Sequence, residues 1–555
     1  MNNTHPVPLG SDQLLKPPVS PDWTSKVQSI PNIILYLIPL VLILSVHSLF
    51  SSTSSQLKSG NVPKHWQTYH LPIIGSSIAY FSKRKDMILE GRDTVPGRYF
   101  SFFVGSKHVV ALSGLQGRQA FFDNRNLNLA QGSVELLMGK PPSLKNPDDY
   151  GLTYLVRPLS ALLQSHVLSK RVPNICKDVD AFTKNLLVQP VSKSNPQWRT
   201  TDIYTTFPPL AFQLMHRAVG FTEIADSPSR IRKTRNFYHR FEKNTSSAHI
   251  IFPWLITPSY LIQGVLAGRI WLDMHRLLSA RRLSQARSRA SVPEKERSKY
   301  DDAIQLLIQK GNSNFEIMQF IFFLFIAGLG TTSFGVSWMI ILLARYPEWQ
   351  VKAREEVQRA IQRHRTSAQQ TDNEVLATLT LQQWESATEF PILSACLKEG
   401  LRILLPGAMF RKNISGKEIH IDSATNDENA GGQIIPAGSY AVYSVADTHM
   451  DNEIYPDAEK YDPSRWLDDD DSRRGGQQPH TYLAWGSGRH ACAGQRLARL
   501  LVYITVAHML VNFDFELSDQ DGGPKTDGAL PPWSTNSHRL EVDDRPIYLR
   551  YKPRE

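Results

Sequence analysis

The chain has 555 residues, of which 41% are hydrophobic and 21% are charged, and its formal net charge is +10. Because it has no collagen-like period and no low-complexity tract, this composition excludes the fibrous and the wholly disordered classes. The positive charge is spread along the chain, which favours an acidic partner or a membrane surface, and no nucleic-acid partner is expected. The cysteines Cys176, Cys396 and Cys492 are too few for a disulfide framework and indicate a reducing compartment.

The N-terminal region predicts a single-pass membrane anchor. Residues 1–32 form a polar tail, and residues 33–50 contain no Lys, Arg, Asp or Glu. As a helix, the second segment would be about 27 Å long, close to the thickness of the hydrocarbon core of a bilayer. A cleaved signal peptide is disfavoured because a long polar tail comes first and no small-residue cleavage pattern follows. The alternative for this segment is a buried core helix.

Residues 51–85 are predicted to be a basic linker that contains serines and prolines. They carry Lys58, Lys64, Lys83, Arg84 and Lys85 and no acidic residue, whereas the flank before the anchor is neutral. By the positive-inside rule, the body of the protein then faces the cytosol, and the endoplasmic reticulum is the expected membrane.

A second uncharged run lies between Glu316 and Arg345 and is long enough to span a membrane. Two glycines and adjacent hydroxyl groups interrupt its middle, where a lipid-facing helix is usually most apolar. A helix that is apolar on every side can instead be the central helix of a large soluble domain. We favour this interpretation over a second span.

Residues 86–555 are predicted to be one large domain, mainly α with a minor β-sheet (α+β). Helical periodicity dominates, for example at 301–310 and 348–364. Strand-like patterns are short and occur at 98–113, 418–421 and 438–445. The segment 468–478 is acidic and polar and is predicted to be a solvated loop.

The most informative segment is the glycine-rich run from Trp485 to Gly494, which places Cys492 just before an apolar helical pattern. Backbone N–H groups at a helix start can stabilise a thiolate, which suits a soft metal. With no second Cys or paired His nearby, tetrahedral zinc is disfavoured and an axial thiolate ligand to haem iron fits better. Glycines such as Gly486 and Gly488 would let the backbone approach a flat macrocycle, and Arg489 would neutralise a carboxylate at its edge. The alternative is a buried structural cysteine beside a glycine turn.

This segment resembles the haem-binding signature of the cytochrome P450 family, an aromatic residue followed by glycines, arginine, cysteine and glycine. Only Trp485 departs from it, standing where phenylalanine is usual. The resemblance covers roughly residues 63 to 550 and implies a P450 fold behind an N-terminal transmembrane helix, with residues 86–555 as the haem-thiolate catalytic domain. It implies that the cofactor is haem (iron protoporphyrin IX) and that Cys492 is the axial ligand of its iron. The implied haem-binding residues are Trp485, Gly486, Gly488, Arg489, Cys492, Gly494 and Arg411.

Two further elements match the family. Glu399 and Arg402 form a Glu-x-x-Arg pair, and residues 461–466 resemble the aromatic-x-Pro-x-Arg-aromatic element that contains Arg465. The resemblance implies that these three residues hold the chain beside the cysteine pocket in a structural role. Arg411 stands where the family often supplies a contact to a haem propionate.

The run from Ala327 to Thr332 is similar to the family's oxygen-activation motif, Ala-Gly-x-acid-Thr-Thr. Ala327, Gly328 and Thr331 are therefore expected to be catalytic, with the Thr331 hydroxyl relaying protons to the oxygen being activated. The alternative is a packed helix in which this threonine bonds a carbonyl one turn back. Gly330 departs from the motif because the family usually has Asp or Glu there, so protons would come through water, another carboxylate or a different chemistry.

A second departure is a missing Trp-x-x-x-Arg before residue 170, for which Arg157 is a candidate substitute. The resemblance implies an anchored eukaryotic, fungal-like monooxygenase that inserts one oxygen atom from O2 into a lipophilic terpenoid, polyketide or alkaloid. Electrons would come from NADPH through a separate membrane-bound P450 reductase, whose acidic surface Arg489, Arg496 and Arg499 could attract. Of these, Arg489 is assigned to haem, and ordinary surface charge explains the other two equally well. Residues 249–262 are apolar and suggest substrate access from the bilayer, although core packing explains them equally well.

Two other functions stay open. One is a haem-thiolate isomerase or dehydratase that acts on a peroxide without reductase, which Gly330 motivates. The other is a non-catalytic haem-binding membrane protein.

Overall fold

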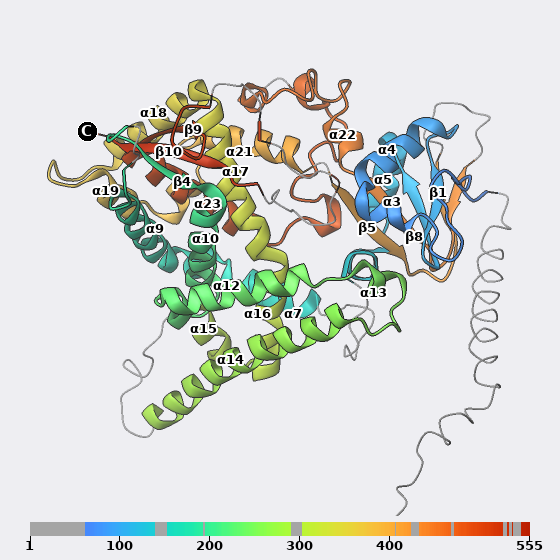
Figure 1. Ribbon diagram of the computed structural model, residues 1–555, viewed down its shortest axis with the longest axis horizontal. Coiled ribbons are helices and arrows are strands. Elements are labelled where there is room, and N and C mark those ends of the chain that lie inside the picture. Colours follow the sequence, from blue (N-terminus) through green and yellow to red (C-terminus); the bar gives the residue numbers. More distant parts are fainter. Residues whose placement is uncertain are drawn as a thin grey trace, which may run out of the picture. The chain divides into compact units, whose positions relative to one another are not determined.

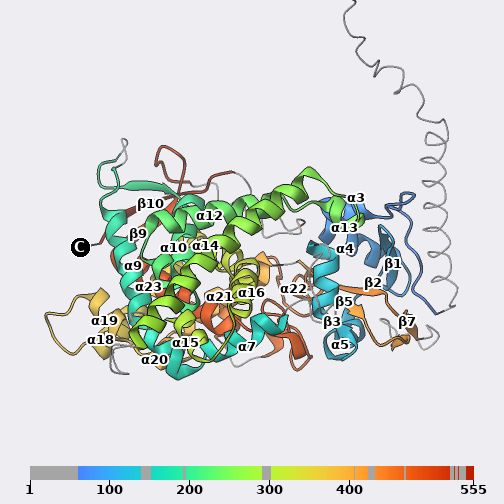
Figure 2. The ribbon, with the colours of Figure 1, turned by 90° about the horizontal axis from the view of Figure 1, so that it is seen from below.

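The computed structural model describes residues 61–138, 152–191, 195–289, 302–405, 407–422, 432–467, 471–525, 530–531, 536 and 545–554. The predicted tail and anchor, residues 1–50, lie outside these ranges. The described residues belong to one compact unit, Ser59–Glu555. Figures 1 and 2 both place a small sheet with its helices at one side of this unit and a larger helical part at the other.

Helices make up most of the described chain, as the sequence predicts. Four lie next to the five-stranded sheet described below: α3 (Ser77–Ser82), α4 (Arg84–Thr94), α5 (Gly114–Asp123) and α6 (Leu129–Ser133). The others are α7 (Leu152–Leu162), α8 (Ser165–Leu168), α9 (Val172–Leu187), α10 (Ile203–Val219), α11 (Thr222–Ala225), α12 (Pro228–Lys243), α13 (Ser247–Ile251), α14 (Pro258–Arg289), α15 (Ala303–Gln309), α16 (Asn314–Leu324), α17 (Gly330–Arg345), α18 (Pro347–His364), α19 (Asp372–Thr378), α20 (Leu381–Glu385), α21 (Pro391–Leu404), α22 (Ala446–His449) and α23 (Gln495–Asn512).

The strands form three small sheets. The five-stranded sheet has the order β1-β2-β8-β5-β3, in which only β2 and β8 run parallel. Its members are β1 (Phe100–Val104), β2 (Lys107–Leu112), β3 (Leu127–Asn128), β5 (Ala408–Asn413) and β8 (Tyr440–Ser444). A three-stranded sheet joins β4 (Arg199–Asp202), β10 (Tyr548–Pro553) and β9 (Phe513–Ser518), and a hairpin joins β6 (Ile419–Ile421) to β7 (Gln433–Ile435). The strands expected at 98–113, 418–421 and 438–445 are therefore present.

The central helix runs continuously from α16 through a π-helical turn, η4 (Phe325–Leu329), into α17. Its 32 residues have the length and composition of a membrane span, but a core helix passes the same test. Within α17 twelve of the sixteen residues are buried, including Trp338 and Ile340, and the helix packs against α10, α21 and α23. This packing favours the interpretation as a core helix.

Hydrogen bonds from side chains to free backbone N–H groups fix where three of these helices begin. Ser313 and Glu316 form a reciprocal capping box at the start of α16, and Thr371 with Glu374 does the same for α19. Buried Glu356 of α18 accepts the backbone N–H of Leu393, at 3.0 Å, in the first turn of α21. A carboxylate at a helix N-terminus satisfies free N–H groups there, so it fixes the position of the helix that carries Glu399.

Most of the predicted linker belongs to the folded unit. Within residues 61–85, the N–H of Trp66 donates to the Ser101 carbonyl at 2.9 Å, and the N–H of Ser76 donates to the Phe103 carbonyl at 2.7 Å. Tyr80 is fully buried in the cluster beneath the small sheet. Serines and prolines indicated a linker there, but the aromatic side chains between them pack into the core, and burial of that apolar area stabilises the folded segment.

Candidate functional site

The cysteine loop folds back on itself before α23. The N–H of Cys492 donates to the Trp485 carbonyl at 2.7 Å, which closes the loop. Gly486 and Gly488 have φ of +71° and +61°, and a Cβ on either would come within 2.9 Å of a backbone oxygen. These two positions therefore require glycine for a backbone reason, independent of any ligand.

The sulfur of Cys492 is accessible, in contrast to the buried Cys176 and Cys396. Surrounding protein atoms desolvate the thiol and raise its pKa, while the N–H groups of Gly494 and Gln495 at the start of α23 act in the opposite direction. The expected N–H contacts are present, but their effect is smaller than that of desolvation. A Cβ on Gly494 would lie 4.0 Å from the sulfur, so this glycine is in direct contact distance of the thiol.

Cationic groups gather next to the loop. Arg411 of β5 is buried, and its Nη1 atom hydrogen-bonds to no residue that the structure describes. Burial lowers the pKa of Arg411 to about 10, and burial together with Arg411 and Arg489 lowers the pKa of His490 to about 4. Gly132 of α6 allows the Arg411 backbone to approach closely, since a Cβ there would come within 2.5 Å of it. A buried guanidinium with an unpaired N–H group needs an anionic or polar partner.

Glu399, Arg402 and Arg465 form the predicted cluster. Both carboxylate oxygens of Glu399 are used: Arg402 donates at 2.9 and 2.8 Å, and Arg465 donates at 2.9 Å. Trp466 adds its indole N–H at 2.8 Å and Asp462 its backbone N–H at 3.1 Å. All three members of the cluster are at most 1% exposed. Such a fully hydrogen-bonded buried network has one geometry, so it can fix the neighbouring chain.

His449, to which no sequence motif points, connects this cluster to the cysteine loop. Its Nδ1 lies 3.0 Å from the carbonyl of Arg402, and its Nε2 accepts the N–H of Leu483 at 2.9 Å, two residues before Trp485. Burial, followed by the charge of Arg402, lowers the pKa of His449 to about 3, so the ring stays neutral at physiological pH. No local pattern marks this residue, because its partners lie 47 and 34 residues away.

The central helix brings the other predicted residues together at its π-helical turn. Ala327 and Thr331 are exposed on a helix that is otherwise mainly buried. The Thr331 hydroxyl donates to the Ala327 carbonyl at 3.0 Å and lies 3.2 Å from that of Gly328, as in the packed-helix alternative. A Cβ on Gly328 would come within 2.9 Å of Met215 of α10. The turn thus leaves an accessible threonine hydroxyl where the helix ladder is interrupted.

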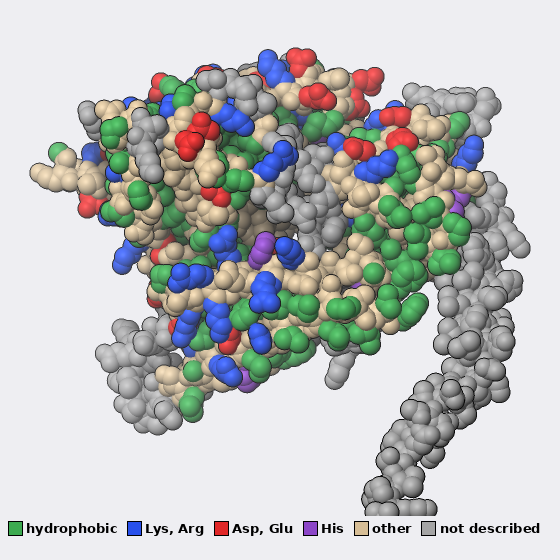
Figure 3. Space-filling model, in the orientation of Figure 1, with side chains coloured by type: hydrophobic (Ala, Val, Ile, Leu, Met, Phe, Trp, Pro, Cys, Tyr) green, Lys and Arg blue, Asp and Glu red, His purple; other side chains and the backbone are tan. Residues whose placement is uncertain are grey.

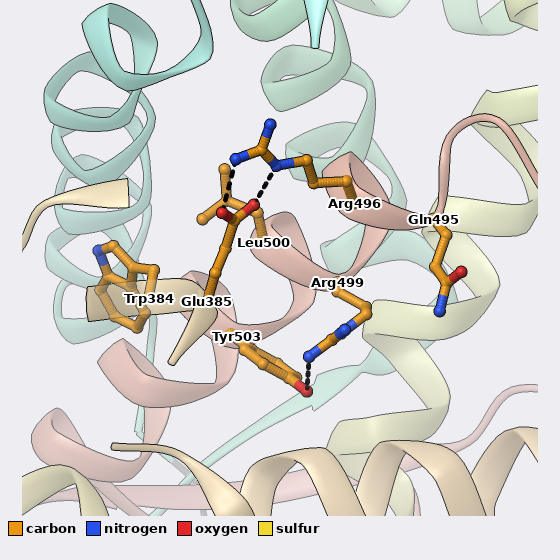
Figure 4. Close-up of a pocket in the computed structure, with 7 residues that line it drawn as sticks. All are labelled: Trp384, Glu385, Gln495, Arg496, Arg499, Leu500 and Tyr503. Carbon is orange, nitrogen blue, oxygen red and sulfur yellow. Dashed lines mark hydrogen bonds and ion pairs between the residues drawn. The ribbon is translucent and has the colours of Figure 1, made fainter. Parts of the chain in front are cut away.

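Beside the first turns of α23 a surface cavity is lined by Trp384, Glu385, Gln495, Arg496, Arg499, Leu500 and Tyr503 (Figure 4). Arg496 is not a free cation there: it pairs with Glu385 and also donates to the carbonyl of Leu163 at 2.6 Å. Arg499 donates to the Tyr503 hydroxyl at 3.4 Å and lies over the Tyr503 ring, 5.6 Å from its centroid. Of the two arginines expected to attract an acidic partner, Arg499 is the better placed. Arg157, the candidate substitute, is exposed on α7 and stays a prediction.

Comparison with known proteins identifies the family. The family model described as Cytochrome P450 matches residues 210–537, which is more than half of the chain. The chain belongs to the cytochrome P450 family. Relatives include "Cytochrome P450 monooxygenase AacuE" of Aspergillus aculeatus, 28% identical over 77% of this chain and 81% of the relative. "Cytochrome P450 monooxygenase dmxR5" of Cryptosporiopsis sp. is 27% identical over 87% of this chain and 88% of that one. A human "Ultra-long-chain fatty acid omega-hydroxylase" is 31% identical over 34% of this P450 and 30% of the human protein.

These matches assign the chain to the P450 monooxygenases, whose fungal members it resembles over most of its length. Membership of the family implies a haem-thiolate cofactor, and the site agrees with that group on two observations. The accessible Cys492 sulfur is a soft ligand of the kind that haem iron accepts. The buried, unpaired Nη1 of Arg411 suits a carboxylate such as a haem propionate.

Proposed function

We propose that this P450 is a membrane-bound monooxygenase that inserts one atom of O2 into a lipophilic small molecule in secondary metabolism, such as a terpenoid, polyketide or alkaloid. The observation that carries the proposal is the accessible sulfur of Cys492, in a loop tied through His449 to the buried Glu399 cluster. This arrangement holds one cysteine rigidly in place without using its sulfur as a core side chain.

Each residue of the site has a role in this proposal. Cys492 would bind the haem iron through its sulfur, and Trp485, Gly486, Gly488 and Gly494 shape the loop around that sulfur. Arg411 and Arg489 bind the carboxylates of the cofactor, since Arg411 is buried with an unpaired Nη1 and Arg489 lies within the cysteine loop. When bound, haem supplies the redox chemistry that activates oxygen. Glu399, Arg402 and Arg465 do no chemistry and keep the loop from shifting.

Thr331 is the proposed proton donor at the oxygen side of the site, with Ala327 and Gly328 forming the helix surface beside it. Its hydroxyl is exposed, and its present acceptors are carbonyls of its own helix. By rotating away from these carbonyls, the hydroxyl can pass a proton onward and accept another. In the resting state, the Thr331 hydroxyl is hydrogen-bonded to the Ala327 carbonyl.

Electrons are proposed to come from NADPH through a separate P450 reductase bound next to α23. Arg499 lines the cavity beside the helix that follows Cys492, so an acidic partner there would lie close to the cysteine loop. Charge attraction of this kind mainly speeds encounter and weakens with salt. Arg496, already paired with Glu385, would contribute less.

The proposed membrane site includes an apolar surface on the catalytic unit. Hydrophobic side chains gather over α13 and the first half of α14 and toward the small sheet (Figure 3). Trp254 is 76% and Ile256 68% exposed, and Ile251 contacts the β1–β2 turn at Gly105, next to α3. The exposed members are Leu71, Ile73, Ile78, Trp254, Leu255, Ile256, Leu261, Ile262 and Val265. Contiguous exposed apolar area of this kind favours a lipid surface over water, and it would admit lipophilic substrates from the bilayer.

The apolar surface gives a direct test. In vesicles containing brominated phospholipids, we expect the fluorescence of the full chain to be quenched through Trp254. Trp254→Phe should remove that quenched fraction, whereas Trp198→Phe should not, because Trp198 packs under Arg550 at 4.5 Å on the three-stranded sheet. Equal quenching in the wild type and in Trp254→Phe would show that this surface does not face lipid.

The function is tested with the full chain in membranes, with added NADPH–P450 reductase. We expect a haem-thiolate carbon monoxide difference spectrum, reductase-dependent NADPH oxidation and conversion of a lipophilic metabolite of the source cells. Thr331→Val should keep the spectrum but raise the hydrogen peroxide released per NADPH. Turnover of an organic hydroperoxide without reductase, and none with it, would select the isomerase or dehydratase. A normal spectrum with no turnover in either assay would select the non-catalytic haem protein.

A further inference from the structure

Gly330, which stands where the family usually has an acid, faces a carboxylate from another helix. A Cβ built on Gly330 would lie 3.2 Å from the Tyr238 hydroxyl and 3.9 Å from Oε1 of Glu242. Both residues are on α12, and the Tyr238 hydroxyl donates to Glu242 at 2.5 Å. An acid therefore lies next to position 330 in space, although none lies there in sequence.

We propose that Glu242 and Tyr238 replace the acid missing at Gly330 and deliver protons to Thr331. The inference rests on the proposed monooxygenase function and assigns the source of its protons. Tyr238 is buried and held in place by an edge contact with Phe212 of α10, with ring centroids 5.6 Å apart. Glu242 is only partly buried, so it can exchange protons with solvent.

The small size of Gly330 is part of the device. A Cβ at 3.2 Å from the Tyr238 oxygen is tighter than nine in ten real Cβ contacts, so a larger side chain at 330 would require the tyrosine to shift by a few tenths of an ångström. Glycine at 330 and the Tyr238–Glu242 pair are thus matched to each other. The same observation accounts for the glycine without invoking a peroxide-rearranging enzyme.

The proton balance of the relay is simple. The Glu242 carboxylate takes one proton from solvent, and the resulting carboxyl O–H donates to the Tyr238 oxygen in place of the original hydrogen bond. Tyr238 passes its own proton toward Thr331, directly or through water, and keeps the one received from Glu242. One proton enters and one leaves, so the pair returns to its original charge. Glu242 and Tyr238 act through Thr331 and are positioning residues of the proton path.

The test uses the full chain with reductase, NADPH and no added substrate, and it measures hydrogen peroxide released per NADPH oxidised and the rate ratio in H2O and D2O. Glu242→Gln and Tyr238→Phe should slow NADPH oxidation by about tenfold, because general acid catalysis contributes about 10² or more and water can replace part of it. Both should raise the peroxide fraction and the solvent isotope effect. The matched control is Glu90→Gln, which removes an exposed carboxylate that accepts the Tyr69 hydroxyl at 2.6 Å.

Two readouts separate a relay from a structural contact. In the resting protein, without turnover, the infrared carboxylate band lost in Glu242→Gln should shift in Tyr238→Phe, with unfolding temperature and carbon monoxide spectrum unchanged. Adding Gly330→Asp to Tyr238→Phe should return the peroxide yield per NADPH toward the wild-type value, because phenylalanine lacks the hydroxyl and leaves room for the aspartate. If Glu242→Gln kept the wild-type peroxide yield per NADPH and the wild-type isotope effect, the relay would be overturned while the monooxygenase function stayed intact. A wild type without haem spectrum would instead overturn the proposed function.

Discussion

Replacing Cys492 with serine is expected to abolish the haem-thiolate carbon monoxide spectrum and all reductase-supported turnover while the chain stays folded. The loop is closed by the backbone N–H of residue 492, which donates to Trp485 at 2.7 Å, and serine keeps that bond. A serine hydroxyl is a hard and weakly acidic donor, so it cannot replace a thiolate as a soft ligand that pushes electron density to the iron. The loss should therefore come from the ligand and not from the loop.

The measurement is the reduced carbon monoxide difference spectrum of membranes, together with haem content and circular dichroism of the purified chain. Cys176→Ser is the matched control, because that sulfur is buried, donates weakly to the Leu376 carbonyl at 3.7 Å and has its pKa raised to about 12 by burial. The control should retain the spectrum with only a loss of stability. An unaltered spectrum in Cys492→Ser would contradict the assignment of the ligand.

The parts of the site that sequence predicts are those whose partners are close in the chain. Cys492 stands in a ten-residue run with two obligatory glycines, and Glu399 and Arg402 are three residues apart on one helix face. Arg465 was placed with them only through the resemblance, since 66 residues separate it from Glu399. The fold class and the central helix were equally accessible, because apolar periodicity and breaks at glycines are local signals.

The parts that escaped prediction depend on distant contacts. His449 has ordinary neighbours in sequence and becomes a bridge only when α21 and the cysteine loop meet it. Arg496 has the appearance of a free cation until Glu385, 111 residues away, neutralises it. Tyr238 and Glu242 are spaced like any surface pair on a helix, and only the packing of α12 brings them to Gly330.

Glu399→Gln is expected to lower the stability of the fold and the yield of folded, haem-containing protein. This one carboxylate accepts hydrogen bonds from two guanidinium groups, and Arg402 and Arg465 are both at most 1% exposed. Glutamine keeps the shape of the glutamate side chain but removes its negative charge. Its NH2 group would also face an N–H donor that now bonds to a carboxylate oxygen. Leaving two buried cations without a counter-charge costs about 3–5 kcal/mol, a large part of the roughly 5–15 kcal/mol that stabilises a typical domain.

Urea unfolding of the full chain in detergent, followed by circular dichroism, measures this loss as a fall in midpoint, and the soluble yield gives a second measure. Glu355→Gln is the matched control: it makes the same chemical change on an exposed face of α18 and should alter stability by less than about 0.5 kcal/mol. If Glu399→Gln kept the wild-type midpoint and still lost haem, the cluster would act at the site directly. Because Arg402 also donates to the His449 carbonyl at 2.6 Å, and His449 holds Leu483, we expect the two losses to occur together.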